Sequence, residues 1–163
     1  MSKRLIACVL VLMCLLTGCL DKSKYPDGIA IDCEDMVLTL PGDFVDLSGE
    51  DYAKDANFMY GWKSLVVMGT AEKKDSLKAM TLAEYTDTVI RGNELTCTAT
   101  QSGNGYLFTY EKPLDGTTYT YTVATFEGTT NFWILQFYGP KENLQENQPE
   151  IDIILEGVQP KKG

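Results

Sequence analysis

The chain has 163 residues and a net charge of −9 at pH 7, from 23 acidic and 14 basic residues, and it contains no histidine. Its hydrophobic fraction of 44% is that of a globular protein and not of a disordered one. The acidic balance argues against binding to nucleic acid or to anionic lipid. The lack of histidine excludes Ser-His-Asp and Cys-His catalysis and the usual zinc sites.

The first 18 residues have the pattern of a bacterial lipoprotein signal peptide. Two basic residues precede an uncharged apolar run over 5–16, which is too short to cross a bilayer but suits a secretory signal. The motif Leu16-Thr17-Gly18-Cys19 follows directly. In such signals a lipid forms a thioether with the cysteine, and cleavage occurs before it. An ordinary secretory signal and an uncleaved anchor helix are the alternatives.

We therefore expect residues 1–18 to be a signal peptide and Cys19 to carry lipid that anchors the protein on the extracytoplasmic side of the cell membrane. Residues 19–27 are mostly polar and predict a linker, which spans no more than roughly 28 Å when extended. Residues 28–163 are long enough for a single domain with its own core. That domain would work close to the membrane.

The first half of this domain predicts short strands around an acidic loop. Pro41-Gly42 ends one strand, and residues 43–57 predict a loop with a short helix after Ser48. The strand-like runs are residues 29–32, 36–40, 58–62 and 64–69.

One helix is predicted over residues 82–91. Thr81 and Glu84 have the spacing of a capping box, in which each side chain accepts a hydrogen bond from the other residue's backbone N–H. Apolar residues recur at helical spacing after it, and Gly92 supplies a stop signal.

The second half predicts an antiparallel meander followed by a helix. Asp115-Gly116 is a strong hairpin signal. The later strands are aromatic and β-branched on both faces, which indicates a sheet that is covered on both sides. The closing helix is expected over residues 142–157, with Pro149 either breaking it or starting its second half. The predicted strands of the meander are residues 95–100, 105–112, 117–126 and 132–138.

This order of elements predicts an α+β fold, a mainly antiparallel sheet of about six strands flanked by helices. Together with Leu40-Pro41-Gly42-Asp43-Phe44, it resembles the PsbP-like fold over residues 28–158. That fold is an α/β/α sandwich, also found in bacterial DcrB-type lipoproteins. The resemblance implies a non-enzymatic assembly or accessory factor of a larger complex. Some PsbP-like proteins bind metal through histidine, and a chain without histidine gives no basis for that role.

Two cysteines, Cys33 and Cys97, lie within the domain. Outside the cytoplasm a disulfide between them is permitted, and two free buried thiols are the alternative. Neither has an imidazole partner that would make it a nucleophile.

The acidic and aromatic residues are the remaining candidates for chemistry. The acidic groups around residues 32–35 and 43–55 do not have the spacing of an EF-hand loop, so we interpret them as solvated surface and expect no metal or cofactor. A carboxylate-pair hydrolase is formally open. Most aromatic side chains should lie in the core, and Trp62 is the one that we most expect at the surface.

The sequence thus favours a non-enzymatic binding or accessory module for another envelope protein, without nucleic acid as a partner. Aromatic side chains rimmed by charge are typical of a partner contact. The candidate contact residues are Trp62, Tyr60, Asp51 and Asp55. A small-ligand or glycan binder that uses an aromatic cleft is the alternative function.

Overall fold

The computed structural model describes residues 25–77 and 79–161, so the predicted signal peptide and Cys19 lie outside the described residues. Short 3-10 turns occur at Asp51–Ala53 (η1), Lys74–Ser76 (η2) and Lys141–Asn143 (η3). The α-helices are α2 (Leu82–Gly92) and α3 (Leu144–Glu156). The strands are β1 (Ile29–Cys33), β2 (Met36–Leu40), β3 (Val45–Asp46), β4 (Phe58–Trp62), β5 (Leu65–Lys73), β6 (Thr100–Ser102), β7 (Gly105–Leu114), β8 (Thr117–Glu127), β9 (Asn131–Pro140) and β10 (Gln159–Pro160).

The described strands form two separate sheets. The large sheet is antiparallel, with the order β3-β4-β5-β9-β8-β7-β6, and the small one has the order β1-β2-β10. The predicted number of about six strands is therefore too low. The additional strands are short: β3 and β10 have two residues each. A run of two residues carries no periodicity by which a sequence could reveal it.

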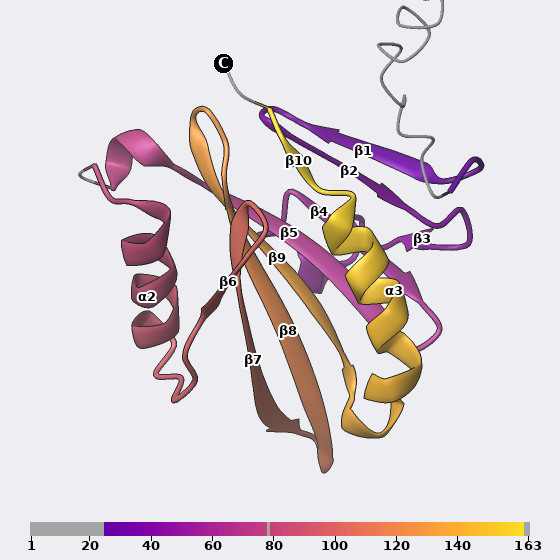
Figure 1. Cartoon of the computed structure of the whole chain (residues 1–163). Coiled ribbons are helices and arrows are strands. Elements are labelled where there is room, and N and C mark those ends of the chain that lie inside the picture. The colour runs from indigo at the N-terminus through magenta and orange to yellow at the C-terminus, as the bar shows by residue number, and fades with distance from the viewer. Residues whose placement is uncertain (1–24, 78, 162–163) are drawn as a thin grey trace, which may run out of the picture.

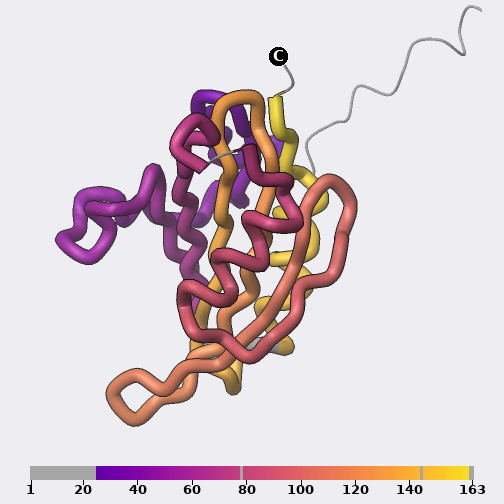
Figure 2. The backbone as a smooth tube through the Cα atoms, turned by 90° about the vertical axis from the view of Figure 1, so that its left-hand side faces the viewer, coloured from indigo at the N-terminus to yellow at the C-terminus, as the bar shows by residue number. Residues whose placement is uncertain are grey.

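The large sheet is covered on both faces (Figures 1 and 2). Alternate residues of β9 show this, because Phe132 and Ile134 pack in a cluster with α2 while Trp133 and Leu135 pack on the opposite side. That second cluster contains Ile151 and Ile154 of α3 together with the apolar residues of β1 and β2. The layering is thus helix, sheet, then a layer of α3 and the small sheet, as the two-sided aromatic pattern predicts.

Helix α2 forms where its capping box predicts it. The Thr81 hydroxyl accepts a hydrogen bond from the Glu84 backbone N–H at 3.3 Å, and the Glu84 carboxylate accepts from the Thr81 N–H at 2.9 Å. The helix is held on the sheet by Tyr85, whose ring stacks on Phe132 with centroids 4.6 Å apart. Both predictions, the helix and its cap, are confirmed.

The β7–β8 hairpin also turns where the sequence predicts. Asp115 and Gly116 both have positive φ, at 50° and 82°, and form the two-residue connection between Leu114 and Thr117. Turns of this kind match the twist of the flanking strands. The prediction of a strand over 95–100 is largely wrong, because only Thr100–Ser102 pairs with β7.

Helix α3 continues through Pro149, so both alternatives predicted for that residue, a break and the start of a second half, are wrong. Proline lacks the N–H that would serve the carbonyl of Gln145, four residues earlier. Both residues are exposed, so water can satisfy that carbonyl. No helix in the described part of the chain is both long and apolar enough to span a membrane.

Candidate functional site

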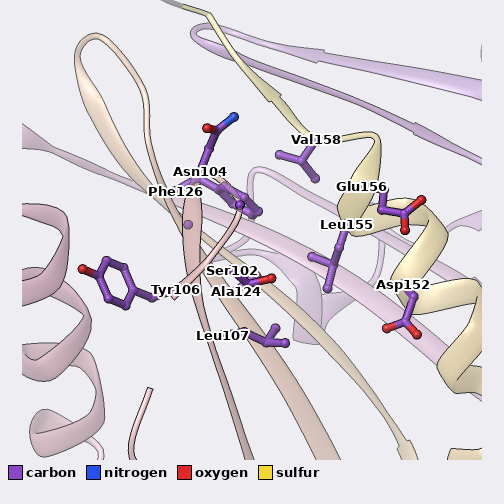
Figure 3. Close-up of a pocket in the computed structure, with 12 residues that line it drawn as sticks. Ser102, Asn104, Tyr106, Leu107, Ala124, Phe126, Asp152, Leu155, Glu156 and Val158 are labelled. Carbon is purple, nitrogen blue, oxygen red and sulfur yellow. The ribbon is translucent and has the colours of Figure 1, made fainter. Parts of the chain in front are cut away.

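A cleft of about 400 Å³ lies between the end of α3 and the first residues of β7 (Figure 3). Its floor is apolar and consists of Leu107, Ala124 and Phe126, and its opposite wall carries Leu155 and Val158. Helix α3 packs on β9 and β2. It therefore leaves part of the adjoining strands β7 and β8 uncovered, and the cleft lies there.

Gly105 shapes the floor of this cleft. A Cβ atom at this position would lie 2.4 Å from the Thr125 carbonyl oxygen and 2.9 Å from the ring of Phe126. Only glycine therefore allows the Phe126 ring to lie across the start of β7. The ring is 6% exposed, so it is fixed in place under the cleft.

Polar groups line opposite sides of the cleft. Ser102 and Asn104 come from β6 and its turn, and Asp152 and Glu156 come from α3. Residues four apart lie on the same side of a helix, so Asp152 and Glu156 are neighbours on α3. Asp152 also accepts a hydrogen bond from Gln148 Nε2 at 2.7 Å. The cleft thus combines an apolar floor with two carboxylates on one side.

These cleft residues were not identified from the sequence. Leu155 and Val158 are apolar and belong by periodicity to the core side of the last helix. The spacing of Asp152 and Glu156 was the one available signal, because it places two acids on one side of the predicted helix. The strands that form the floor come from elsewhere in the chain, and no local pattern shows that they lie opposite α3.

Trp62 is half-buried instead of protruding from the surface. Its ring stacks on Phe44 with centroids 5.9 Å apart, and the Lys63 ammonium lies 4.2 Å from its centroid. Trp62 and Tyr60 both pack against the core cluster on the α3 side of the sheet. Burial, and secondarily the Asp46 carboxylate, raises the pKa of Tyr60.

Asp51 and Asp55 lie in the exposed segment before β4. Leu47 lies between β3 and β4 and contacts Gly61. Because side chains alternate along a strand, Gly61 is on the face of β4 opposite to the face that carries Trp62 and Tyr60. The structure thus brings Trp62 and Tyr60 together and places the start of the acidic segment on the other face of β4.

The acidic group around residues 32–35 is not entirely solvated surface, because Asp35 is 4% exposed. Its carboxylate accepts hydrogen bonds from Trp133 Nε1 at 2.5 Å, the Thr130 N–H at 2.8 Å and the Asn131 N–H at 3.0 Å. Burial alone would raise its pKa, but the donors from Trp133, Thr130 and Asn131 outweigh burial and lower the pKa to about 2. Asp35 is thereby held as a buried anion.

The two described cysteines are free and lie in different layers. Cys33 packs against the cluster on the α3 side, and Cys97 packs against the cluster on the α2 side. The sheet therefore separates them, and the disulfide that the sequence permits is not formed. Burial, and secondarily Asp32, raises the pKa of Cys33, which opposes use of its thiol as a nucleophile.

Three tyrosines form a stacked row on the α2 side of the sheet. The ring centroids of Tyr110 and Tyr121 are 4.7 Å apart, and those of Tyr121 and Tyr138 are 5.3 Å apart. Burial, and secondarily Tyr121, raises the pKa of Tyr110 to about 12. Because the rings stack on one another, they use their faces for mutual contact.

Among residues 25–77 and 79–161, no group of three or more histidine, cysteine, aspartate or glutamate side chains is arranged to hold a metal ion.

Comparison with known proteins finds no matching family model and no matching curated protein. A solved structure from Bacteroides thetaiotaomicron is similar, with a TM-score of 0.55 and 12% identity over 78% of this chain. The alignment covers 45% of that protein, so this chain spans less than half of its length.

Two other solved structures are similar over most of their own length. The Ran-binding protein Mog1p of Saccharomyces cerevisiae has a TM-score of 0.51 and 10% identity, over 83% of this chain and 96% of that one. Cyanobacterial PsbP from Synechocystis has a TM-score of 0.49 and 7% identity, over 82% of this chain and 92% of that one. A PsbP protein is thus among the similar structures, but the fold assignment rests on the two scores above 0.5. At these identities the likenesses establish a shared fold and nothing about function.

Proposed function

We propose that this protein is a lipid-anchored, extracytoplasmic lipoprotein that acts as a non-enzymatic binding or accessory module for an envelope protein. The cleft between α3 and β6–β8 would be its binding site, and this cleft is the observation that carries the proposal. Anchoring is inferred from Leu16-Thr17-Gly18-Cys19 alone. The accessory role agrees with the PsbP-like resemblance of the sequence.

The composition of the cleft supports binding in preference to catalysis. Apolar side chains form its floor and one wall, and its rim carries two carboxylates. A buried apolar patch with a polar rim is the usual anatomy of a protein contact. A hydrolytic role would need a carboxylate pair around a reacting bond, whereas Asp152 and Glu156 lie side by side on one helix.

A small-ligand binder is the second candidate. A volume of about 400 Å³ falls within the range of small-molecule sites, which favours this reading. The glycan version of it has weaker support. Sugars stack on open aromatic faces, whereas Tyr110, Tyr121 and Tyr138 turn their faces toward one another.

The anchor and the cleft can be tested separately. Cys19→Ala should prevent incorporation of labelled fatty acid and leave unprocessed precursor. In the anchored protein, Leu155→Ala should weaken capture of the envelope partner by about tenfold, because a packed anchor at a contact is lost. Leu114→Ala is the matched control, since Leu114 is 53% exposed at the far hairpin.

Unchanged fatty-acid incorporation in the Cys19→Ala chain would contradict the anchor. Equal capture by the Leu155→Ala and Leu114→Ala chains, at equal melting temperatures, would contradict the role of the cleft.

A further inference from the structure

One edge of the large sheet, at the three-residue strand β6, carries neither a charged residue nor a proline. The two edge strands of this sheet are β3 and β6. The β3 edge has two residues and carries Asp46, and the part of β7 beyond β6 carries Lys112 and Pro113. Charged residues and proline are the usual protection of a sheet edge. The three residues of β6, in contrast, are exposed and uncharged: Thr100, Gln101 and Ser102.

The backbone of Gln101 faces outward from this edge. Ser102 and Gly105 flank a two-residue turn, so they form the hydrogen-bonded pair that closes it. Such pairs alternate along an antiparallel ladder, so Thr100 bonds toward β7 while the N–H and C=O of Gln101 point away from it. An extended segment can pair with these two groups.

A strand added at this edge would direct alternate side chains into the cleft. Ser102 lines the cleft, and in a sheet the residues beside it on an added strand share its face. Strand addition of this kind obtains affinity from main-chain hydrogen bonds and specificity from pockets for every second side chain. The cleft occupies the position of such a pocket.

The charge of the cleft indicates which side chain would enter it. The floor of Leu107, Ala124 and Phe126 is apolar, whereas Asp152 and Glu156 lie on the far side. Lysine and arginine have an apolar stem and a cationic head, so they match both parts. An acidic side chain would meet two like charges in a chain that already carries −9.

We propose that the partner is recognised through an extended segment that pairs with β6 and places a lysine or arginine side chain across the cleft onto Asp152 and Glu156. This inference rests on the proposed function, because it names the chemistry of the partner at the same cleft. It specifies both a backbone contact, at Gln101, and a side-chain contact, at the two carboxylates.

The side-chain contact can be tested with a labelled nine-residue peptide of alternating lysine and valine. Its affinity for the full-length chain, in a zwitterionic detergent, is measured by fluorescence anisotropy. Asp152→Asn combined with Glu156→Gln should weaken binding about tenfold, whereas Asp51→Asn combined with Asp55→Asn should change it less than about twofold. Both variants remove two charges, so general attraction to an acidic protein would affect them equally. A peptide of alternating glutamate and valine should bind at least about tenfold more weakly than the lysine peptide.

The backbone contact is tested at Gln101. Gln101→Pro removes the outward N–H and should weaken binding of the lysine peptide about tenfold, whereas Gln101→Ala should bind it like the original chain. Proline is tolerated at an edge where the N–H faces solvent, so the variant should keep its melting temperature. In the original chain, the peptide should slow hydrogen exchange at the Gln101 amide.

Equal effects of the two charge variants would overturn the proposal, as would full binding by the Gln101→Pro chain or unchanged exchange at Gln101. Should Leu155→Ala still weaken partner capture in that case, the cleft keeps its proposed function and only the chemistry of the occupant is wrong. If the peptide tests fail and Leu155→Ala also leaves partner capture unchanged, the proposed function itself is contradicted.

Discussion

Asp35 links two parts of the chain that lie far apart in the sequence. Its carboxylate accepts hydrogen bonds from the segment that enters β9, at Thr130, Asn131 and Trp133, while Asp35 itself lies in the turn between β1 and β2. The main-chain carbonyl of Asp35 also accepts from the Lys161 N–H at 2.7 Å. One residue thereby holds the small sheet, the large sheet and the end of the chain together.

We expect Asp35→Asn to lower the free energy of unfolding by about 2 kcal/mol at pH 7, because a buried anion with several donors is replaced by a neutral group. The pKa of Asp35 is about 2 in the folded protein against an ordinary 3.8. Its stabilisation is therefore present above about pH 4 and is lost as the pH falls through about 2.

Urea unfolding at pH 7 and at pH 2.5 measures this effect. The difference in free energy of unfolding between the original chain and the Asp35→Asn chain should be large at pH 7 and smaller at pH 2.5. Asp51→Asn, at an exposed position, is the control and should differ little at either pH. A difference that does not change with pH would contradict the charged state of Asp35.

Trp62→Ala is expected to destabilise the domain by roughly 2 kcal/mol, because its half-buried ring packs on Phe44 and on the core. Chemical denaturation measures the loss, and Tyr52→Ala, which removes a ring that is 64% exposed, is the comparison. Equal stability of the two variants would show that Trp62 acts at the surface, as the sequence alone suggests.

At the scale of elements, the contribution of the Thr81 cap to the stability of α2 can be tested directly. Thr81→Ala removes the hydroxyl that accepts from the Glu84 N–H, and we expect it to cost about 1 kcal/mol. Thr81→Ser keeps the hydroxyl and should restore most of that loss. The measurement is the urea unfolding midpoint of the original, Thr81→Ala and Thr81→Ser chains under one condition. An unchanged midpoint for Thr81→Ala would contradict the cap.

The elements that the sequence predicts correctly are those fixed by neighbouring residues. The capping box joins residues three apart, and Asp115-Gly116 determines its own turn. The Asp35 network could not be predicted in this way, because its partners lie 95 to 98 residues further along the chain. The cleft is missed for the same reason, since its walls come from β6–β8 and α3.

In the segment before β6 the sequence predicts the burial pattern correctly but not the strand pairing. Leu95, Cys97 and Ala99 pack inward while the residues between them are exposed, which is the alternation that predicts a strand. Ladder pairing, however, begins only at Thr100. Periodicity reports which side chains are buried, whereas a strand also requires a partner, and the position of that partner is a tertiary property.

At the scale of the whole molecule, the sheet keeps Cys33 and Cys97 apart, and we expect both thiols to be free in the folded protein. Unfolding without reductant, followed by alkylation and peptide mapping, should recover both cysteines in the alkylated form. A cross-linked peptide that contains both residues would require the two core layers to meet, and it would contradict the described arrangement.

Photo-crosslinking in intact cells tests whether an anchored module binds an envelope protein through the cleft. A photoreactive residue replaces Leu155 in the cleft wall or, as the control, Asp87 on the exposed side of α2. We expect one discrete protein adduct from position 155 and none from position 87. The adduct should be suppressed by the lysine–valine peptide in isolated envelopes and lost in the Cys19→Ala chain. No adduct from position 155, or the same adduct from both positions, would contradict binding through the cleft.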